Sequence, residues 1–128
     1  MRMTFINLPV RDLTTAAEFY RALGFTGDQA EQDGGTRVLT ISENTRLVLH
    51  LRSGFESYTG VAATDTETSR EVVVGLSAQS REQVDELVDQ AAVAGGQSLG
   101  PGMVNGPMYM RGFRDLDGHQ WSFLHMAG

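Results

Sequence analysis

The sequence predicts an α+β fold in which two tandem βαβββ modules form a curved mixed sheet around a cavity, with the helices on the outer face. The order strand, helix, three strands occurs twice along the chain, which is typical of an internal duplication. A doubly wound parallel sheet would need more helices than this pattern offers. We therefore expect a single domain over 1–128, with module one over about 1–52, a linker over about 53–70 and module two over about 71–128.

Composition limits the class of protein and its partners. A chain of 128 residues has the usual size of one domain and can bury a sizeable core. It has no cysteine, which excludes disulfides and thiolate metal sites. Its formal net charge of −6, without any cluster of Lys or Arg, argues against nucleic acid, because phosphates would be repelled. No signal peptide and no apolar run of membrane length is visible. We expect a cytoplasmic protein that binds something small, with no membrane partner.

Module one begins with alternating apolar residues over Thr4–Val10, and a period of two predicts a strand. A helix is expected from about Leu13 to Leu23, because Asp12 is a good N-cap and Gly24 ends the apolar stripe. Turn-forming residues then separate three shorter segments of strand character. These segments lie near Phe25, over Arg37–Ile41 and over Arg46–Arg52.

The linker Ser53–Arg70 is polar and weakly patterned, and we expect at most a short helical turn around Phe55–Tyr58. Module two then repeats the pattern. A strand is predicted over Glu71–Ala78, and a capping box at Ser80–Gln83 opens a helix that Gly95 and Gly96 end. The last two strands, Met108–Arg114 and Gln120–Met126, are joined by the turn sequence Asp115–Gly118, a strong hairpin signal.

Strand parity divides the side chains of the predicted sheet between two faces. The apolar set should face the helices: Ile6, Leu8, Leu47, Leu49, Leu51, Val72, Val74, Leu76, Trp121 and Phe123. The opposite set mixes aromatic, aliphatic, amide, imidazole, hydroxyl and charged groups, which fits a partly polar cavity. The candidate ligand-binding residues are therefore Phe5, Asn7, Val48, His50, Arg52, Val73, Gln120 and Ser122. The other interpretation is that this set is the solvated side of an open sheet.

Several segments, in this order, resemble one protein superfamily. They are the opening Leu8–Leu13, the pairs around the end of the first helix at Phe19–Tyr20 and Leu23–Phe25, and the closing Phe113–His119, which has Leu116 where Pro is commoner. Over essentially its whole length the chain resembles the glyoxalase, bleomycin-resistance and extradiol-dioxygenase superfamily, also called vicinal oxygen chelate. That resemblance implies the fold predicted above.

The resemblance also implies four inward positions that carry His, Glu or Gln metal ligands in metal-using relatives. It places them at Phe5, His50, Val73 and Ser122, the same residues that strand parity turns inward. Only His50 is a good ligand, whereas a catalytic divalent site usually takes three protein ligands. We therefore expect no metal at this position and no cofactor, and metal-dependent glyoxalase-type catalysis is disfavoured.

His50 is the candidate catalytic residue, because an imidazole with an ordinary pKa of about 6.5 can transfer protons at neutral pH. The alternative is a histidine whose hydrogen bonds are satisfied by Asn7 or Ser122. We expect His119 at the surface and His125 near the helix face or a subunit contact. Arg52 and Arg111 either bind an anionic ligand or form salt bridges.

Two features stay open at the level of sequence. One parity set of the Met108–Arg114 strand lines the cavity, but the pattern does not decide which. Phe55 and Tyr58 form either a lid over the cavity mouth or a hydrophobic clip.

Three functions remain in competition. The first is a metal-free protein that binds a small organic molecule, which the acidic surface suggests is cationic, and the resemblance implies a homodimer. The second is a lyase, isomerase or dioxygenase-type enzyme on a small oxygenated metabolite, with His50 or a rearranged metal site. The third is a structural subunit without a ligand.

Overall fold

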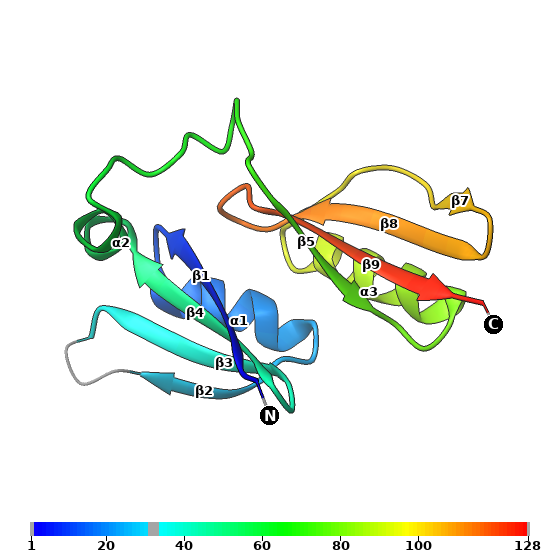
Figure 1. Cartoon of the computed structure of the whole chain (residues 1–128), viewed down its shortest axis with the longest axis horizontal. Coiled ribbons are helices and arrows are strands. Elements are labelled where there is room, and N and C mark those ends of the chain that lie inside the picture. Colours follow the sequence, from blue (N-terminus) through cyan, green and yellow to red (C-terminus); the bar gives the residue numbers. More distant parts are fainter. Residues whose placement is uncertain (1, 31–33, 128) are drawn as a thin grey trace. The chain divides into compact units, whose positions relative to one another are not determined.

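The computed structural model describes residues 2–30 and 34–127 and shows two compact units, Met1–Thr64 and Asp65–Gly128, each with its own sheet (Figure 1). In both units a strand is followed by a helix and then by further strands. The predicted α+β fold with two tandem modules is confirmed.

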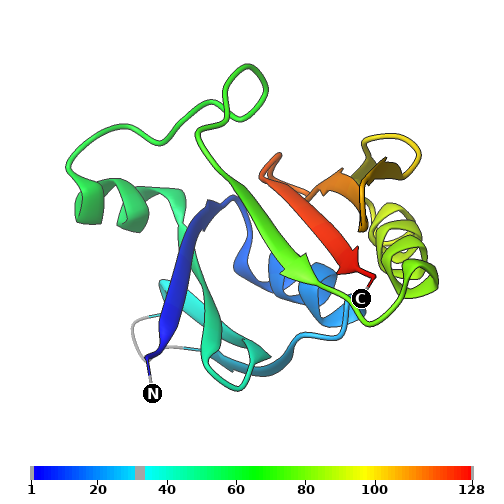
Figure 2. The same cartoon turned by 45° about the vertical axis from the view of Figure 1, so that its right-hand side comes forward.

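Unit one has a four-stranded mixed sheet. Its elements are β1 (Thr4–Val10), α1 (Leu13–Ala22), β2 (Thr26–Ala30), β3 (Thr36–Ser42), β4 (Thr45–Leu51) and α2 (Arg52–Thr59). The strand order is β1-β4-β3-β2, with β1 parallel to β4 and the other neighbours antiparallel. Helix α1 packs on β3 and β4, and α2 continues directly from the end of β4 (Figure 2).

Unit two has a mixed sheet of five strands. Its elements are β5 (Val73–Ser77), α3 (Arg81–Val93), β6 (Gln97–Ser98), β7 (Met103–Asn105), β8 (Met108–Arg114) and β9 (Gln120–Met126). The strand order is β5-β9-β8-β6, with β7 paired to β8 and β5 parallel to β9. Helix α3 packs on β8 and β9.

The first turns of α1 and α3 are capped as the sequence predicts. The Asp12 carboxylate accepts a hydrogen bond of 2.8 Å from the backbone N–H of Thr15. The Ser80 hydroxyl accepts one of 3.0 Å from the N–H of Gln83. The Gln83 side chain in turn accepts the N–H of Gln79 at 2.6 Å, one residue before the partner of a standard capping box. These bonds satisfy N–H groups that a helix leaves without partners.

Each unit has its own apolar core between helix and sheet. In unit one the parallel register pairs Leu8 with Leu49, and both side chains are buried, as are those of Leu39 and Leu47. In unit two the rings of Phe113 and Trp121 are stacked with centroids 6.3 Å apart. Burial of one such side chain contributes about 1.5–3 kcal/mol, so these residues fix which face of each sheet meets its helix.

The boundaries differ from the sequence prediction where strand pairing ends. The last β1–β4 pair is Val10 with Leu51, and beyond it Arg52 is the first residue of α2 rather than a strand residue. The side chain of Leu51 is exposed at this end. Strand β5 begins at Val73, so Val72 precedes it and is also exposed, not part of the helix-facing set.

Other elements were also incompletely predicted. The short helical turn expected at Phe55–Tyr58 is a helix of 8 residues. Two short strands, β6 and β7, lie in the glycine-containing segment before β8, where the repeated pattern predicts one strand without assigning residues to it. Segments of two and three residues are too short for a period of two to be recognised.

A contact between Tyr109 and Gly102 fixes the loop before β7. The Tyr109 hydroxyl donates a hydrogen bond of 2.7 Å to Asp85 on α3, and the guanidinium of Arg81 lies 5.2 Å from the ring centroid. A Cβ atom at Gly102 would collide with the Tyr109 hydroxyl oxygen. Only glycine therefore fits at position 102 while Tyr109 keeps its place.

Gly102→Ala should lower the free energy of unfolding by about 1–3 kcal/mol, because the added methyl overpacks against Tyr109. Gly54→Ala is the matched control, since a Cβ there meets open space within α2. It should raise stability by about 0.5–1 kcal/mol through helix propensity. Urea denaturation of both variants checks the pair, and a neutral Gly102→Ala would contradict the contact.

Candidate functional site

The candidate site in unit one is built on the face of β1 and β4 that is turned away from the buried leucines. Phe5 and Asn7 on β1 and Val48 and His50 on β4 share this face, because side chains alternate along each strand. Phe5 is 57% exposed, whereas Val48 and His50 are half-buried. The sequence-based parity prediction therefore holds for these four residues.

A hydrogen bond joins the two polar members of this face. Nε2 of His50 lies 2.8 Å from Oδ1 of Asn7, and Nδ2 of Asn7 donates to the carbonyl of Phe5 at 3.4 Å. The second bond orients the amide with its oxygen toward the imidazole. Since an amide oxygen only accepts, Nε2 of His50 must carry the hydrogen, and Nδ1 of a neutral ring is then an acceptor.

Helix α2 adds aromatic side chains to this face. The ring centroid of His50 lies 5.8 Å from that of Phe55 and 6.4 Å from that of Tyr58. Phe55 is half-buried, while Tyr58 is 81% exposed. Helix α2 contacts both β1 and β4. Phe55 and Tyr58 were considered either as a lid over the cavity mouth or as a hydrophobic clip. The structure places both rings beside the His50 imidazole.

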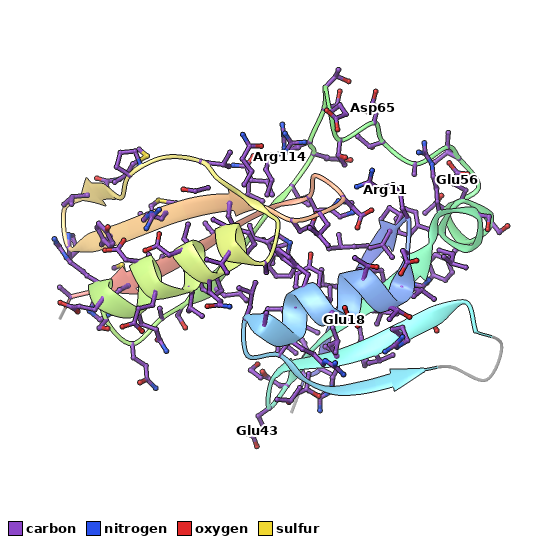
Figure 3. The ribbon with its side chains drawn as sticks, turned by 180° about the vertical axis from the view of Figure 1, so that it is seen from behind. Arg11, Glu18, Glu43, Glu56, Asp65 and Arg114 are labelled. Atoms are coloured by element: carbon purple, nitrogen blue, oxygen red, sulfur yellow. The ribbon has the colours of Figure 1, made fainter. Side chains whose placement is uncertain are left out.

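A set of polar contacts ties α2 to the segment that follows it. Glu56, labelled on the helix in Figure 3, accepts a hydrogen bond of 2.7 Å from the backbone N–H of Ala63. Arg52 forms an ion pair of 3.4 Å with Glu56 and donates to the Ala63 carbonyl at 3.4 Å. The Ala63 N–H and then Arg52 lower the pKa of Glu56. Arg52, predicted to bind ligand, is thus engaged by a carboxylate of its own helix.

Three predicted site residues belong to unit two. Val73, Gln120 and Ser122 lie on one face of β5 and β9, where the register pairs Val73 with Gln120 and Gly75 with Ser122. Ser122 is only 5% exposed. The predicted residues therefore form two groups, and each group comes together within its own unit.

The orientation of β8 answers the question that parity left open. Met110 is paired with Leu124 and Gly112 with Ser122, so Met108, Met110 and Gly112 share the face of Ser122. The alternate set, which includes Tyr109 and Arg111, meets α3.

Arg111 is not available to an anionic ligand at this face. Its side chain is 12% exposed and lies 3.2 Å from both Asp85 and Asp89. It also donates to the Gly100 carbonyl and the Ser98 hydroxyl. The salt-bridge alternative is the one observed.

The other two histidines belong to unit two and have local roles. Nδ1 of His125 lies 3.2 Å from the carbonyl oxygen of Ala78. The Asp115 carboxylate accepts the N–H groups of Asp117 and His119 at 2.9 Å each, which confirms the predicted turn. Within residues 2–30 and 34–127, no three His, Asp or Glu side chains gather in a group that could hold a metal ion.

The residues at the family's metal-ligand positions do not fit a divalent metal. As the resemblance aligns them, they are a benzyl ring at Phe5, an imidazole at His50, an isopropyl group at Val73 and a hydroxyl at Ser122. A catalytic site takes about three good ligands, and this set supplies one.

The sequence identifies both partners of the hydrogen bond between His50 and Asn7, because Asn7 was one of the two residues expected to bond to the imidazole. It did not find the contacts among Arg52, Glu56 and Ala63. The spacing of Arg52 and Glu56, four residues apart on a helix, was the available signal, but the helix itself was predicted only as a short turn.

Comparison with known proteins supports one family. A family model described as the Glyoxalase/Bleomycin resistance protein/Dioxygenase superfamily matches residues 2–123. A hypothetical protein from S. aureus is 30% identical, with a TM-score of 0.85, over 98% of this chain and 94% of that one. No protein of curated function matches the chain.

Two further solved structures share the fold at lower identity. A glyoxalase-related enzyme from Fulvimarina pelagi is 21% identical, with a TM-score of 0.81, over 98% of this chain and 88% of that chain. A glyoxalase/bleomycin resistance protein/dioxygenase family enzyme from Burkholderia phytofirmans PsJN is 16% identical, with a TM-score of 0.80, over 98% of this chain and 99% of that chain.

Among the helices of the described residues, none has the length and apolar character needed to span a membrane.

The stability of the protein should depend on the protonation of His50. Burial lowers the pKa of His50 below its ordinary value of 6.5, so the unfolded state binds the proton more readily. As the pH drops from 7.5 through the region just below 6.5, the free energy of unfolding should therefore fall further in the wild-type protein than in His50→Gln. Urea denaturation at a series of pH values checks this, and a constant difference between the two proteins would contradict it.

Proposed function

This chain belongs to the Glyoxalase/Bleomycin resistance protein/Dioxygenase superfamily, and we propose that it binds a small organic molecule without the divalent metal of its metal-using relatives. The proposed site residues are Phe5, Asn7, Val48, His50 and Arg52 in unit one and Val73, Gln120 and Ser122 in unit two. The poor match of Phe5, Val73 and Ser122 to metal-ligand chemistry supports the metal-free part of this proposal.

The observation that carries the proposal is the hydrogen bond from His50 to Asn7 among exposed aromatic side chains. Phe5 and Tyr58 leave much of their ring surface in water, and burying that surface would stabilise a complex by about 25 cal/mol per Å². The oriented imidazole and amide supply polar groups that can select among ligands. Apolar walls with a few placed polar groups are the usual composition of a small-molecule site.

A second candidate is a lyase, isomerase or dioxygenase-type enzyme on a small oxygenated metabolite. Its support is the state of His50, whose pKa is lowered by burial and whose ring is held by Asn7. A neutral imidazole with Nδ1 as its acceptor can take a proton from a bound substrate, and Asn7 would act as the positioning residue.

We further propose that the chain acts as one vicinal-oxygen-chelate domain, in the cytoplasm, and forms a homodimer. Support comes from exposed apolar side chains on and near the β7–β8 edge and at the end of β9, since such groups are often covered in an assembly. They are Leu99, Met103, Val104 and Met126. A strict monomer in light scattering would count against the dimer.

Elemental analysis of freshly purified protein should find no stoichiometric metal. Titration with nickel, zinc, manganese and ferrous iron, followed by calorimetry, should give no micromolar binding, because the family positions supply one good ligand. One tightly bound ion per chain that is lost in His50→Ala would overturn the metal-free proposal and favour a rearranged catalytic centre.

Binding of small organic molecules should depend on the exposed rings of unit one. A fragment collection screened by backbone NMR shifts should give ligands that perturb β1, β4 and α2, and Tyr58→Ala should weaken them about tenfold, or about 1.4 kcal/mol. Val93→Ala is the control, because Val93 is equally exposed but lies on α3. A screen in which no compound perturbs this face would refute the binding function, and equal effects of the two variants would refute the role of Tyr58.

A further inference from the structure

We infer that the site formed by β1, β4 and α2 selects an uncharged aromatic ring that carries an O–H or N–H donor, with that donor on Nδ1 of His50. The inference rests on the proposed binding function and narrows its ligand to one chemical class. It depends on three features of the described residues: the acceptor Nδ1 of His50, the aromatic rings around that imidazole and the charges near the site.

The acceptor follows from the hydrogen bonds of His50. Within the described part of the chain the imidazole makes one hydrogen bond, through Nε2 to Oδ1 of Asn7 at 2.8 Å. The amide is held in this orientation by its own donation to the Phe5 carbonyl. Nδ1 of the neutral ring therefore has a lone pair that attracts an O–H or N–H group and repels a carboxylate.

The surroundings of this lone pair favour a flat ring. Phe55 meets the imidazole edge-on at an interplanar angle of 64°, and Tyr58 is tilted against it by 32°. Phe5, one strand away, exposes more than half of its surface on the same face. Aromatic pairs stabilise a complex beyond the area that they bury, so a planar ligand gains more here than an aliphatic one.

Charge does not favour an anion at this place. Arg52 is paired with Glu56 at 3.4 Å, so the two charges of α2 offset one another. The guanidinium of Arg46, at the other end of β4, donates to the Ser42 carbonyl at 2.7 Å. Because the whole chain has a net charge of −6, the long-range field also disfavours an anion.

The position of α2 is set before any ligand arrives. The hydrogen bond from the Ala63 N–H to Glu56 joins the helix to the segment that follows it, and the ion pair of Arg52 with Glu56 links the first turn of the helix to its middle. Gly60, with φ of +79°, ends the helix in the left-handed conformation that favours glycine. A preorganised wall lowers the ordering cost of binding.

The experiment compares phenol with anisole and benzoate as probes of the full-length protein at pH 7.5. Phenol and anisole share a ring but differ in the donor, and benzoate tests an anion on the same ring. The backbone shifts of Asn7, His50 and Phe55 should respond to phenol. Phenol should bind about tenfold more tightly than anisole, the factor expected for one hydrogen bond of about 1.4 kcal/mol. Benzoate should be the weakest of the three.

His50→Phe keeps a ring but removes the acceptor, so the preference of phenol over anisole should fall to near one. Asn7→Ala removes the group that orients the imidazole and should reduce the preference in the same direction, which keeps the test available if His50→Phe does not fold. His125→Phe, in unit two, should leave the preference unchanged.

The outcomes separate this inference from the binding function on which it rests. If benzoate or anisole binds at this face as tightly as phenol, the inference is wrong and the binding function stands. The inference is also wrong if the preference for phenol survives in His50→Phe. If none of the three probes perturbs this face, the inference fails, and the wider fragment screen decides whether the binding function fails with it.

Discussion

The register of β1 on β4 is the constraint on which the rest of unit one depends. In that register Leu8 lies beside Leu49, and α1 covers the buried side chains of β3 and β4. A slip by one residue would turn all these side chains to the opposite face. Each buried leucine contributes about 1.5–3 kcal/mol, whereas one hydrogen bond such as that of His50 with Asn7 contributes about 1 kcal/mol. The apolar face therefore decides the register, and the position of His50 is its consequence.

The end of the same pairing explains the aromatic wall. Pairing of β1 with β4 stops at Leu51, and the chain turns directly into α2. Phe55 and Tyr58 follow His50 by five and eight residues, so one short helix returns both rings to the neighbourhood of the imidazole. The hydrogen bond from the Ala63 N–H to Glu56 then ties the helix to the segment that follows it. The core and the candidate site are thus two results of one strand pair.

Much of this could be predicted from the sequence, because burial imposes a period of two on paired strands. The parity prediction is correct for Phe5, Asn7 and His50, which all lie within the paired part of their strands. It fails for Arg52 and Val72, which lie beyond the ends of pairing, where alternation no longer has a physical cause. It could not decide the orientation of β8, because Arg111 on the helix-facing side is compensated by Asp85 and Asp89 of α3. Such compensation comes from a distant segment and leaves no local pattern.

The protonation state of the His50 ring is the most direct test of the role assigned to Asn7. A long-range ¹H–¹⁵N spectrum of protein labelled at its histidines, at pH 7.5, distinguishes a nitrogen that carries a hydrogen from one with a lone pair. Nε2 of His50 should carry the hydrogen and Nδ1 the lone pair, and Asn7→Ala should shift the population toward the other tautomer. A ring protonated at Nδ1, or a spectrum unchanged by Asn7→Ala, would contradict the claim that Asn7 orients His50 toward a ligand.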